Sequence, residues 1–331
     1  MSALEVSAAF APGHDTPDLV ALAEELGYAR AWLYDSPALY HDVWMTLALA
    51  AERTSRIGLG PAVLVPSLRH PMVNAAAIAT LADLVPGRVA VAIGAGFTGR
   101  HVLGQRPMRW ADVREYIVVL RALLRGDDAE WEGATIRMIH PVGFGAPRPI
   151  AVRILVGADG PRGAAVAAEV ADGTFAAGRP NSSSTGSWTG LLQFGTVLDD
   201  GEAIDSARVI EAAGPGLAVA LHARLEMAGP DAVDRVPGGQ VWREAVEQVP
   251  PERRHLAVHE GHVVALTDRD RAALEAGAAA RIPNLTLTGT AEQVRARVDR
   301  FAESGITELA YHAAGPDIPR ELRAFANAAG L

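Results

Sequence analysis

A glycine-rich turn is the stretch whose residue types and spacing point most directly to chemistry. Residues 94–99 come directly after an apolar run, 89–93, and place three glycines with the spacing G-x-G-x-x-G. A glycine turn at the end of a buried strand lets a ligand approach the backbone closely. The dinucleotide-binding form of this motif needs a helix that opens at the last glycine, but Gly104 and Pro107 would interrupt such a helix. We therefore favour a strand–helix loop at the active face of a parallel barrel.

A second set of turns has the residue types of an anion site. Residues 157–160, Gly-Ala-Asp-Gly, stand between a predicted strand and a predicted helix, where backbone N–H groups suit an anion. The next predicted strand ends beside a glycine and an arginine. Ordinary strand-end turns have the same composition, and that reading stays open. The candidate contacts for a cofactor phosphate are Gly157, Ala158, Asp159, Gly160, Ala177, Gly178 and Arg179.

Three histidines near residue 260 invite a metal interpretation. His255 and His259 have i, i+4 spacing, and His262 comes shortly after them. The pattern is not H-E-x-x-H, because the second histidine comes one residue early. We expect no metal, and instead histidines that pack near the site.

The elements that must position these residues alternate between strand and helix. The predicted strands are 4–10, 29–34, 57–65, 89–93, 153–156, 173–177, 192–198 and 307–312. Eight strands with helices between them predict a (β/α)8 barrel, an α/β fold, with a doubly wound sheet as the alternative. Pro61 cannot donate to a ladder, so the third strand should end in a bulge.

Other segments are expected to be irregular. A predicted helix, 206–227, contains the breakers Gly214-Pro215-Gly216. Residues 229–254 read as an inserted polar segment, and 181–190 as a Ser/Thr/Gly loop.

Composition limits the function classes. With 331 residues, 49% hydrophobic and 21% charged, the chain should be globular, and we expect a single domain over 1–331. The absence of cysteine excludes disulfides, thiolate metal sites and a cysteine nucleophile. A net charge of −9 argues against nucleic acid as a partner. No apolar run reaches membrane-spanning length and no basic leader is seen, so we expect no membrane association and a cytoplasmic location.

Several short motifs together indicate a family. They are Gly58-Leu59-Gly60-Pro61-Ala62-Val63, Arg69-His70-Pro71, Pro86-Gly87-Arg88, Gly157-Ala158-Asp159-Gly160-Pro161, Ala171-Asp172-Gly173 and Thr288-Gly289-Thr290-Ala291-Glu292. In this order and spacing, the chain from about 4 to 317 resembles the luciferase-like monooxygenase superfamily. The nearest resemblance is to the branch typified by methylenetetrahydromethanopterin reductase, which uses the deazaflavin coenzyme F-420. The resemblance implies a (β/α)8 barrel with insertions, a homodimer, and a flavin or deazaflavin lying across the carboxyl-end face.

The resemblance also assigns roles to particular residues. Pro61-Ala62-Val63 matches the bulge behind the ring, with a non-prolyl cis bond at Ala62–Val63. Asp35 matches a position near the ring, although a turn acid would look the same. Ala95 and Gly96 would lie beneath the cofactor.

The residues after the glycine turn are less clearly assigned. Arg100 and His101 would touch the ring, its tail or the substrate, or else lie solvated in the loop. The deazaflavin sugar dehydrogenases of this superfamily carry a glutamate where this chain has Phe97, which argues against their acid/base arrangement. The candidate catalytic residues are therefore Asp35 and His101.

Three functions remain open from the sequence. The first is hydride transfer between F-420 and an organic small-molecule substrate, which the reductase-like motifs favour. The second is a reduced-FMN monooxygenase, which must shelter its oxygenated flavin from water. The third is a barrel that binds without catalysis, which the intact glycine turns argue against.

Overall fold

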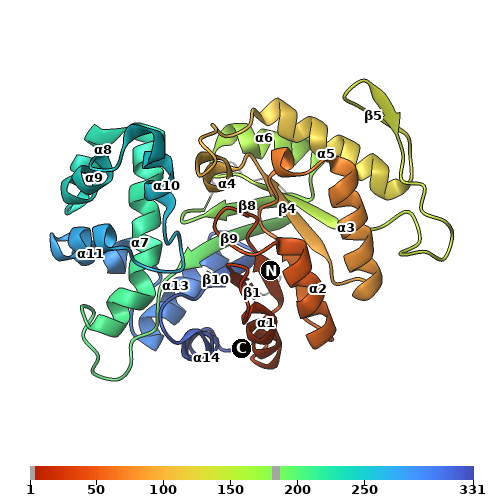
Figure 1. Ribbon diagram of the computed structural model, residues 1–331. Coiled ribbons are helices and arrows are strands. Elements are labelled where there is room, and N and C mark those ends of the chain that lie inside the picture. The colour runs from red at the N-terminus through yellow and green to blue at the C-terminus, as the bar shows by residue number, and fades with distance from the viewer. Residues whose placement is uncertain (1–3, 181–186) are drawn as a thin grey trace.

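Eight parallel strands close into a barrel in the computed structural model, which describes residues 4–180 and 187–331 (Figure 1). In chain order they are β1 (Glu5–Phe10), β2 (Arg30–Leu33), β3 (Gly58–Pro61), β4 (Ala90–Gly94), β7 (Arg153–Gly157), β8 (Gly173–Ala177), β9 (Trp188–Phe194) and β10 (Glu308–His312). Their order in the sheet is β3-β2-β1-β10-β9-β8-β7-β4. Parallel bridges Leu59–Val89 and Leu64–Ile93 join β3 to β4 and complete the ring. The predicted (β/α)8 barrel is confirmed, and the doubly wound sheet is excluded.

Amphipathic helices pack their apolar faces on the outside of these strands. They are α1 (Thr16–Glu25), α2 (Val43–Arg53), α3 (Pro71–Leu84), α5 (Trp110–Arg125), α6 (Pro161–Val170), α13 (Ala291–Glu303) and α14 (Ile318–Ala329). Local sequence fixes where several begin: the Asp42 carboxylate accepts hydrogen bonds from the first turn of α2. Thr290 and Gln293 form a capping box on α13. The main hydrophobic core lies between the strands and these helices.

The barrel interior holds small residues and a few large aromatic ones. Alanines at positions 9, 90, 92 and 310 leave room for the rings of Trp32, Phe175 and Trp188. At the amino-terminal end of the strands, Glu308 is completely buried and accepts hydrogen bonds from the indole nitrogens of Trp32 (2.8 Å) and Trp188 (2.5 Å). This packing fills the amino-terminal end of the barrel. Ligand chemistry is therefore left to the carboxyl-terminal loops.

A helical lobe comes after β9 and lies to one side of the barrel (Figure 1). It contains α7 (Ala207–Ala228), α8 (Pro230–Asp234), α9 (Gly239–Glu247), η2 (Pro251–Arg253), α10 (Arg254–His259), α11 (Asp268–Glu275), η3 (Ala278–Arg281) and α12 (Ile282–Leu285). The lobe has its own hydrophobic cluster, in which the buried Trp242 donates a hydrogen bond to Asp270 (2.9 Å). The expectation of a polar insertion at 229–254 was wrong, because α8 and α9 pack apolar faces into this cluster. The single-domain assignment of 1–331 stays a prediction.

Three further local features differ from or extend the predictions. Helix α7 continues through Pro215, so the expected break at 214–216 does not occur. Strand β9 begins at Trp188, four residues before the predicted start, while 181–186 of the expected Ser/Thr/Gly loop lie outside the described residues. A two-stranded antiparallel hairpin, β5 (Ala129–Trp131) and β6 (Ala134–Ile136), projects from the barrel before β7 (Figure 1). Within the described ranges, no helix is long and apolar enough to cross a membrane.

Candidate functional site

The predicted site residues lie at the carboxyl ends of one continuous arc of strands. Asp35 comes after β2, Ala62 and Val63 come after β3, and residues 95–101 come after β4. Strand β7 ends at Gly157 and is followed by residues 158–160, and strand β8 ends at Ala177 and is followed by residues 178 and 179. The sheet order places β2, β3, β4, β7 and β8 next to one another once the β3–β4 bridges close the ring. The fold therefore brings the candidate residues to one side of the barrel mouth.

A bulge after β3 forms the centre of this arc. The Ala62–Val63 peptide bond is cis, as the resemblance implied. A Cβ atom on Gly94 would lie 2.8 Å from Val63 Cγ2, and one on Gly157 would lie 2.6 Å from Val63 Cγ1. These two glycines therefore make room for the Val63 side chain rather than for a ligand. Val63 is only half-buried, and so it presents an apolar surface at the mouth of the barrel.

Three rings lie at the ends of β2, β9 and β10, and two of them, Tyr34 and Phe194, pack on the same interior cluster as Val63. The His312 ring, at the end of β10, lies 5.3 Å from Tyr34 and 5.5 Å from Phe194, measured between ring centroids. The Tyr34 hydroxyl is buried and has no hydrogen-bond partner among residues 4–180 and 187–331. Burial raises the pKa of Tyr34 well above its ordinary value, so the hydroxyl stays protonated and can donate. It is an unused donor beside an apolar surface.

His312 contacts two backbone carbonyls. Its Nδ1 lies 3.0 Å from the Ala9 oxygen and its Nε2 lies 3.0 Å from the Val263 oxygen. Burial lowers the pKa of His312, although both carbonyls oppose the shift. The contact with Val263 ties the helical lobe to the barrel mouth. The Tyr40 hydroxyl makes a similar link by donating to the His262 carbonyl oxygen (2.6 Å).

Asp35 is committed to an internal ion pair. Arg69 Nη1 donates to both of its carboxylate oxygens at 2.7 Å, and the Val65 amide donates to Oδ2 at 3.3 Å. Burial raises the pKa of Asp35, and the hydrogen bonds from Arg69 oppose that shift. Arg69 also pairs with Asp42 at 2.9 Å, which connects the loop after β3 with the start of α2. This geometry supports a structural role for Asp35, and its catalytic assignment stays a prediction.

The glycine turn after β4 is shaped by its own packing. Gly96 has φ +80° and precedes a short helix, α4 (Phe97–His101), that the sequence did not predict. A Cβ atom on Gly96 would lie 2.4 Å from Val65 Cγ1 and 2.9 Å from Arg100 Cγ. The Ala95 carbonyl accepts a hydrogen bond from the Met108 amide (2.9 Å), which holds the end of the turn. Protein atoms therefore occupy the space that a side chain at Gly96 would need, and the cofactor contact of Ala95 and Gly96 stays a prediction.

Arg100 and His101, the last two residues of α4, each contact another part of the protein. Arg100 donates to the Arg106 carbonyl oxygen (2.6 Å) and to the Ser67 hydroxyl, so it ties two loops together. His101 lies 3.5 Å from Glu226 and so faces the helical lobe. Burial lowers the pKa of His101, while Glu226 opposes the shift. Their assignment as contacts to the ring, its tail or the substrate stays a prediction.

The anion-type turns after β7 and β8 are held together and remain open. Asp159 Oδ1 accepts a hydrogen bond from the Ala177 amide (2.7 Å), which links the two loops. Gly160 and Gly178 have no described atom within 4 Å of the place where a Cβ would sit. The exposed Arg179 side chain makes no hydrogen bond or ion pair with residues 4–180 or 187–331. Open space, a cation without a partner in the described part of the chain, and the start of α6 suit an anion.

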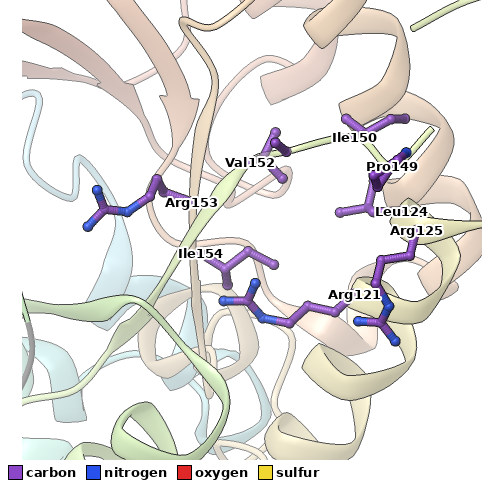
Figure 2. A pocket seen from close by; sticks show the side chains of 9 residues that line it. Arg121, Leu124, Arg125, Pro149, Ile150, Val152, Arg153 and Ile154 are labelled. Atoms are coloured by element: carbon purple, nitrogen blue, oxygen red, sulfur yellow. The ribbon is translucent and has the colours of Figure 1, made fainter. Parts of the chain in front are cut away.

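A pocket of about 350 Å³ lies at the other end of the barrel, near the start of β7 (Figure 2). Its lining residues are Arg121, Leu124, Arg125, Pro149, Ile150, Ala151, Val152, Arg153 and Ile154. Arg121 is paired with Asp172 and Arg125 with Asp127. Figure 2 shows Arg153 pointing away from both other arginines, and it lies over the Trp188 ring. The charges of this pocket are already engaged, so we assign it no cofactor.

Comparison with known proteins identifies the family. The model of the luciferase-like monooxygenase family matches residues 3–308, which is most of the chain. The chain belongs to the luciferase-like monooxygenase family. This membership confirms the resemblance drawn from the short motifs.

Two curated relatives of this luciferase-like chain are a reductase and an F420-dependent dehydrogenase. The 5,10-methylenetetrahydromethanopterin reductase of Archaeoglobus fulgidus is 31% identical over 163 residues, covering 47% of each chain. The F420-dependent glucose-6-phosphate dehydrogenase of Nocardia farcinica is 34% identical over 173 residues, covering 47% of this chain and 51% of the relative. The chain thus spans about half the length of the curated relatives it matches.

Solved structures extend the similarity of fold over nearly the whole luciferase-like chain. The structure of an F420-dependent secondary alcohol dehydrogenase aligns with a TM-score of 0.67 at 17% sequence identity. The alignment covers 99% of this chain and 98% of the dehydrogenase chain. The F420-dependent tetrahydromethanopterin reductase of Methanopyrus kandleri has a TM-score of 0.66 at 18% identity, covering 98% of both chains. A monooxygenase from Streptomyces bottropensis reaches 0.60 at 18% identity, covering 98% of both. At these identities the likeness supports the fold alone.

The structure adds residues to the site that sequence reasoning missed. Tyr34 and His312 were not singled out, because neither belongs to a motif. The signal for His312 was present in the period-two alternation of its strand, where Glu308, Ala310 and His312 share the interior face. Phe194, the last residue of β9, lies beside His312 at the mouth.

Proposed function

We propose that this chain is an oxidoreductase that holds F420 across the carboxyl-end face of the barrel and transfers hydride between it and an organic small molecule. The observation that carries the proposal is the apolar Val63 surface, which packs on the same interior cluster as Tyr34, whose hydroxyl has no hydrogen-bond partner among the described residues. A flat aromatic cofactor needs an apolar wall and a few precisely placed polar groups. One curated relative is named as an F420-dependent dehydrogenase and another as a methylenetetrahydromethanopterin reductase, and these names support the choice of cofactor.

The residues present fit such a cofactor at both of its ends. Val63 would contact the ring face, and Gly94 and Gly157 keep the bulge in position behind it. Tyr34 would donate its free hydroxyl to the bound group. Residues 158–160 and 177–179 would hold the phosphate-bearing tail through backbone N–H groups and Arg179.

The chemistry assigned to the chain's own residues is positioning and exclusion of water. F420, when bound, supplies a ring carbon that accepts or releases hydride. Phe194 and Val63 give the mouth apolar walls, and the His312 ring is fixed there by its contacts with the Ala9 and Val263 carbonyl oxygens. Phe97 packs edge-on against His101 at 4.7 Å between ring centroids, so the acid/base glutamate of the sugar dehydrogenases has no equivalent there. We therefore propose a substrate other than a sugar phosphate.

Cofactor titration tests this proposal. We expect F420 to bind with micromolar or tighter affinity and FMN to bind more weakly. Intrinsic fluorescence and cofactor absorbance give the two dissociation constants on the same preparation. Tight binding of FMN with none of F420 would instead support the reduced-FMN monooxygenase. Binding of neither cofactor would support a non-catalytic barrel.

Arg179→Ala should weaken F420 binding by about 1.5–3 kcal/mol, the scale of a charge-assisted hydrogen bond. The side chain is exposed and free of described protein partners, so its loss should leave the melting temperature unchanged. Arg253→Ala, an exposed arginine on the helical lobe, is the matched control and should not change the affinity. An unchanged dissociation constant for Arg179→Ala would show that this guanidinium does not touch the cofactor.

A further inference from the structure

A cluster of potential metal ligands lies between the barrel mouth and the helical lobe, outside the proposed cofactor face. His101 comes from α4, Glu226 from α7 and His259 from α10, and one ligand atom from each lies within 4.8 Å of the other two. Glu226 Oε2 is 3.5 Å from His101 Nε2, and Glu226 Oε1 is 3.8 Å from His259 Nε2. Three separate elements thus direct nitrogen and oxygen atoms at one point.

The hydrogen bonding of this cluster is incomplete. His259 is fully buried, and neither of its ring nitrogens has a hydrogen-bond partner in the described parts of the chain. The Nδ1 atom of His101 is also buried without a partner there. Buried polar atoms in native proteins are nearly always satisfied, so such a group calls for an unseen partner. The two imidazole rings lie nearly parallel, at 13°, with centroids 6.1 Å apart.

We propose that His101, Glu226 and His259 bind a divalent transition-metal cation of the zinc class. Two histidines and one carboxylate are a ligand set that zinc accepts, with water at a fourth position. Ligands at about 2.0–2.2 Å from a tetrahedral ion lie about 3.3–3.6 Å from one another. The two separations from Glu226, 3.5 and 3.8 Å, therefore need only small shifts, and the two histidine nitrogens lie within 4.8 Å of each other. The carboxylate offsets part of the charge of the cation. Glu226 keeps 22% of its side chain exposed, which leaves a path for the ion from solvent.

A neighbouring set of histidines is the competing location. His222 and His262 also lie with His259 in a group of suitable spacing. However, His222 Nδ1 and His262 Nδ1 are 3.1 Å apart, which is a hydrogen bond between them, and His262 Nε2 lies 3.2 Å from Thr98 Oγ1. These two rings already have partners, and their group contains no carboxylate. The negative charge of Glu226, and the His259 Nε2 atom that faces it without a described hydrogen-bond partner, therefore favour the group with Glu226.

Such an ion would join the loop after β4 to the helical lobe. His101 ends α4, directly after the glycine turn, while Glu226 and His259 belong to the lobe. Because only the folded chain brings these three residues together, a bound ion should raise the melting temperature. This inference does not depend on which cofactor the barrel holds.

The experiment measures metal binding to the whole chain without a histidine tag. The protein is treated with a chelator, dialysed against Zn²⁺ or Co²⁺, and analysed for metal content, for Co²⁺ visible absorption and for melting temperature. We expect one equivalent of metal and a tetrahedral Co²⁺ spectrum. Glu226→Gln and His101→Gln should each weaken the affinity at least about tenfold, since even the loss of a residue that only supports a ligand costs about 10–100-fold. His262→Gln is the matched control and should retain the metal.

The outcomes separate the possibilities. Absence of metal binding to the unmodified chain would overturn the proposal. Loss of metal in His262→Gln with retention in Glu226→Gln would also overturn it, because the ion would then lie among the other histidines. Circular dichroism shows whether each variant is folded. If His101→Gln does not fold, the metal affinity of Glu226→Gln alone tests the proposed site.

Discussion

Replacing Glu308 with alanine is expected to lower the free energy of unfolding by about 3–5 kcal/mol, the usual cost of removing one member of a buried ion pair. Its carboxylate is completely buried and lies 3.7 Å from the Arg30 guanidinium. It also accepts hydrogen bonds from the Trp32 and Trp188 indoles and from the Ser7 hydroxyl. Alanine would leave these donors without an acceptor and Arg30 without its counter-ion. Urea unfolding monitored by circular dichroism measures the loss.

Two control variants make this prediction specific. Glu303→Ala removes an exposed glutamate near the end of α13 and should change stability by no more than about 0.5 kcal/mol. Arg30→Met in the Glu308→Ala background should recover part of the loss, because it removes the unpaired buried cation. A loss below about 1 kcal/mol in Glu308→Ala would mean that the amino-terminal end of the barrel is held by apolar packing alone.

The sequence predicted the barrel well because its strands are buried on both sides or bounded by clear turn residues. Seven of the eight strands overlap the predicted ranges closely, and Pro61 correctly indicated the bulge after β3. The exception is β9, where Trp188, Thr189 and Gly190 were assigned to a polar loop. Gly190 is needed there because a Cβ atom would lie 2.6 Å from the Phe175 ring. Only the packing of two distant strands reveals that requirement.

The helical lobe was the least predictable part, because long-range packing there overrides local propensity. Pro215 should interrupt a helix, yet α7 continues through it. Its neighbours need the close approach that glycine allows. A Cβ on Gly214 would lie 2.9 Å from Leu266, and one on Gly216 would lie 2.4 Å from Phe194. Sequence periodicity cannot show such contacts between segments that are far apart in the chain.

The sequence predicted where the candidate residues lie in the barrel, and their roles stay predictions. The strand-end rule correctly placed Val63 and Arg179 on the same side of the barrel mouth. It could not show that Asp35 is engaged by Arg69, or that His101 faces Glu226, because both facts depend on the direction of a side chain. Tyr34 belongs to no motif, and it is noticed only because its buried hydroxyl has no hydrogen-bond partner among the residues that the structure describes.

Gly96→Ala should destabilise the chain by about 2–5 kcal/mol even without cofactor, adding a left-handed backbone penalty to an overpacking cost. Gly96 has φ +80°, and its new Cβ would lie 2.4 Å from Val65 Cγ1. Gly178→Ala is the matched control, because Gly178 has φ +77° but no described atom near its Cβ position. It should show the backbone penalty alone, about 1–2 kcal/mol. Gly160→Ala, with extended backbone and open space, should be nearly neutral.

The difference between the first two variants isolates the packing of the glycine turn. If Gly96→Ala loses more stability than Gly178→Ala, the turn after β4 is glycine-rich because Val65 and Arg100 occupy the space beside it. F420 affinity, measured at a temperature where Gly96→Ala is folded, should then fall little. Equal stability of the two variants, together with complete loss of F420 binding in Gly96→Ala, would instead place the cofactor directly against Gly96. In that case Val65 must move when the cofactor binds, and the bulge after β3 would be only part of the binding surface.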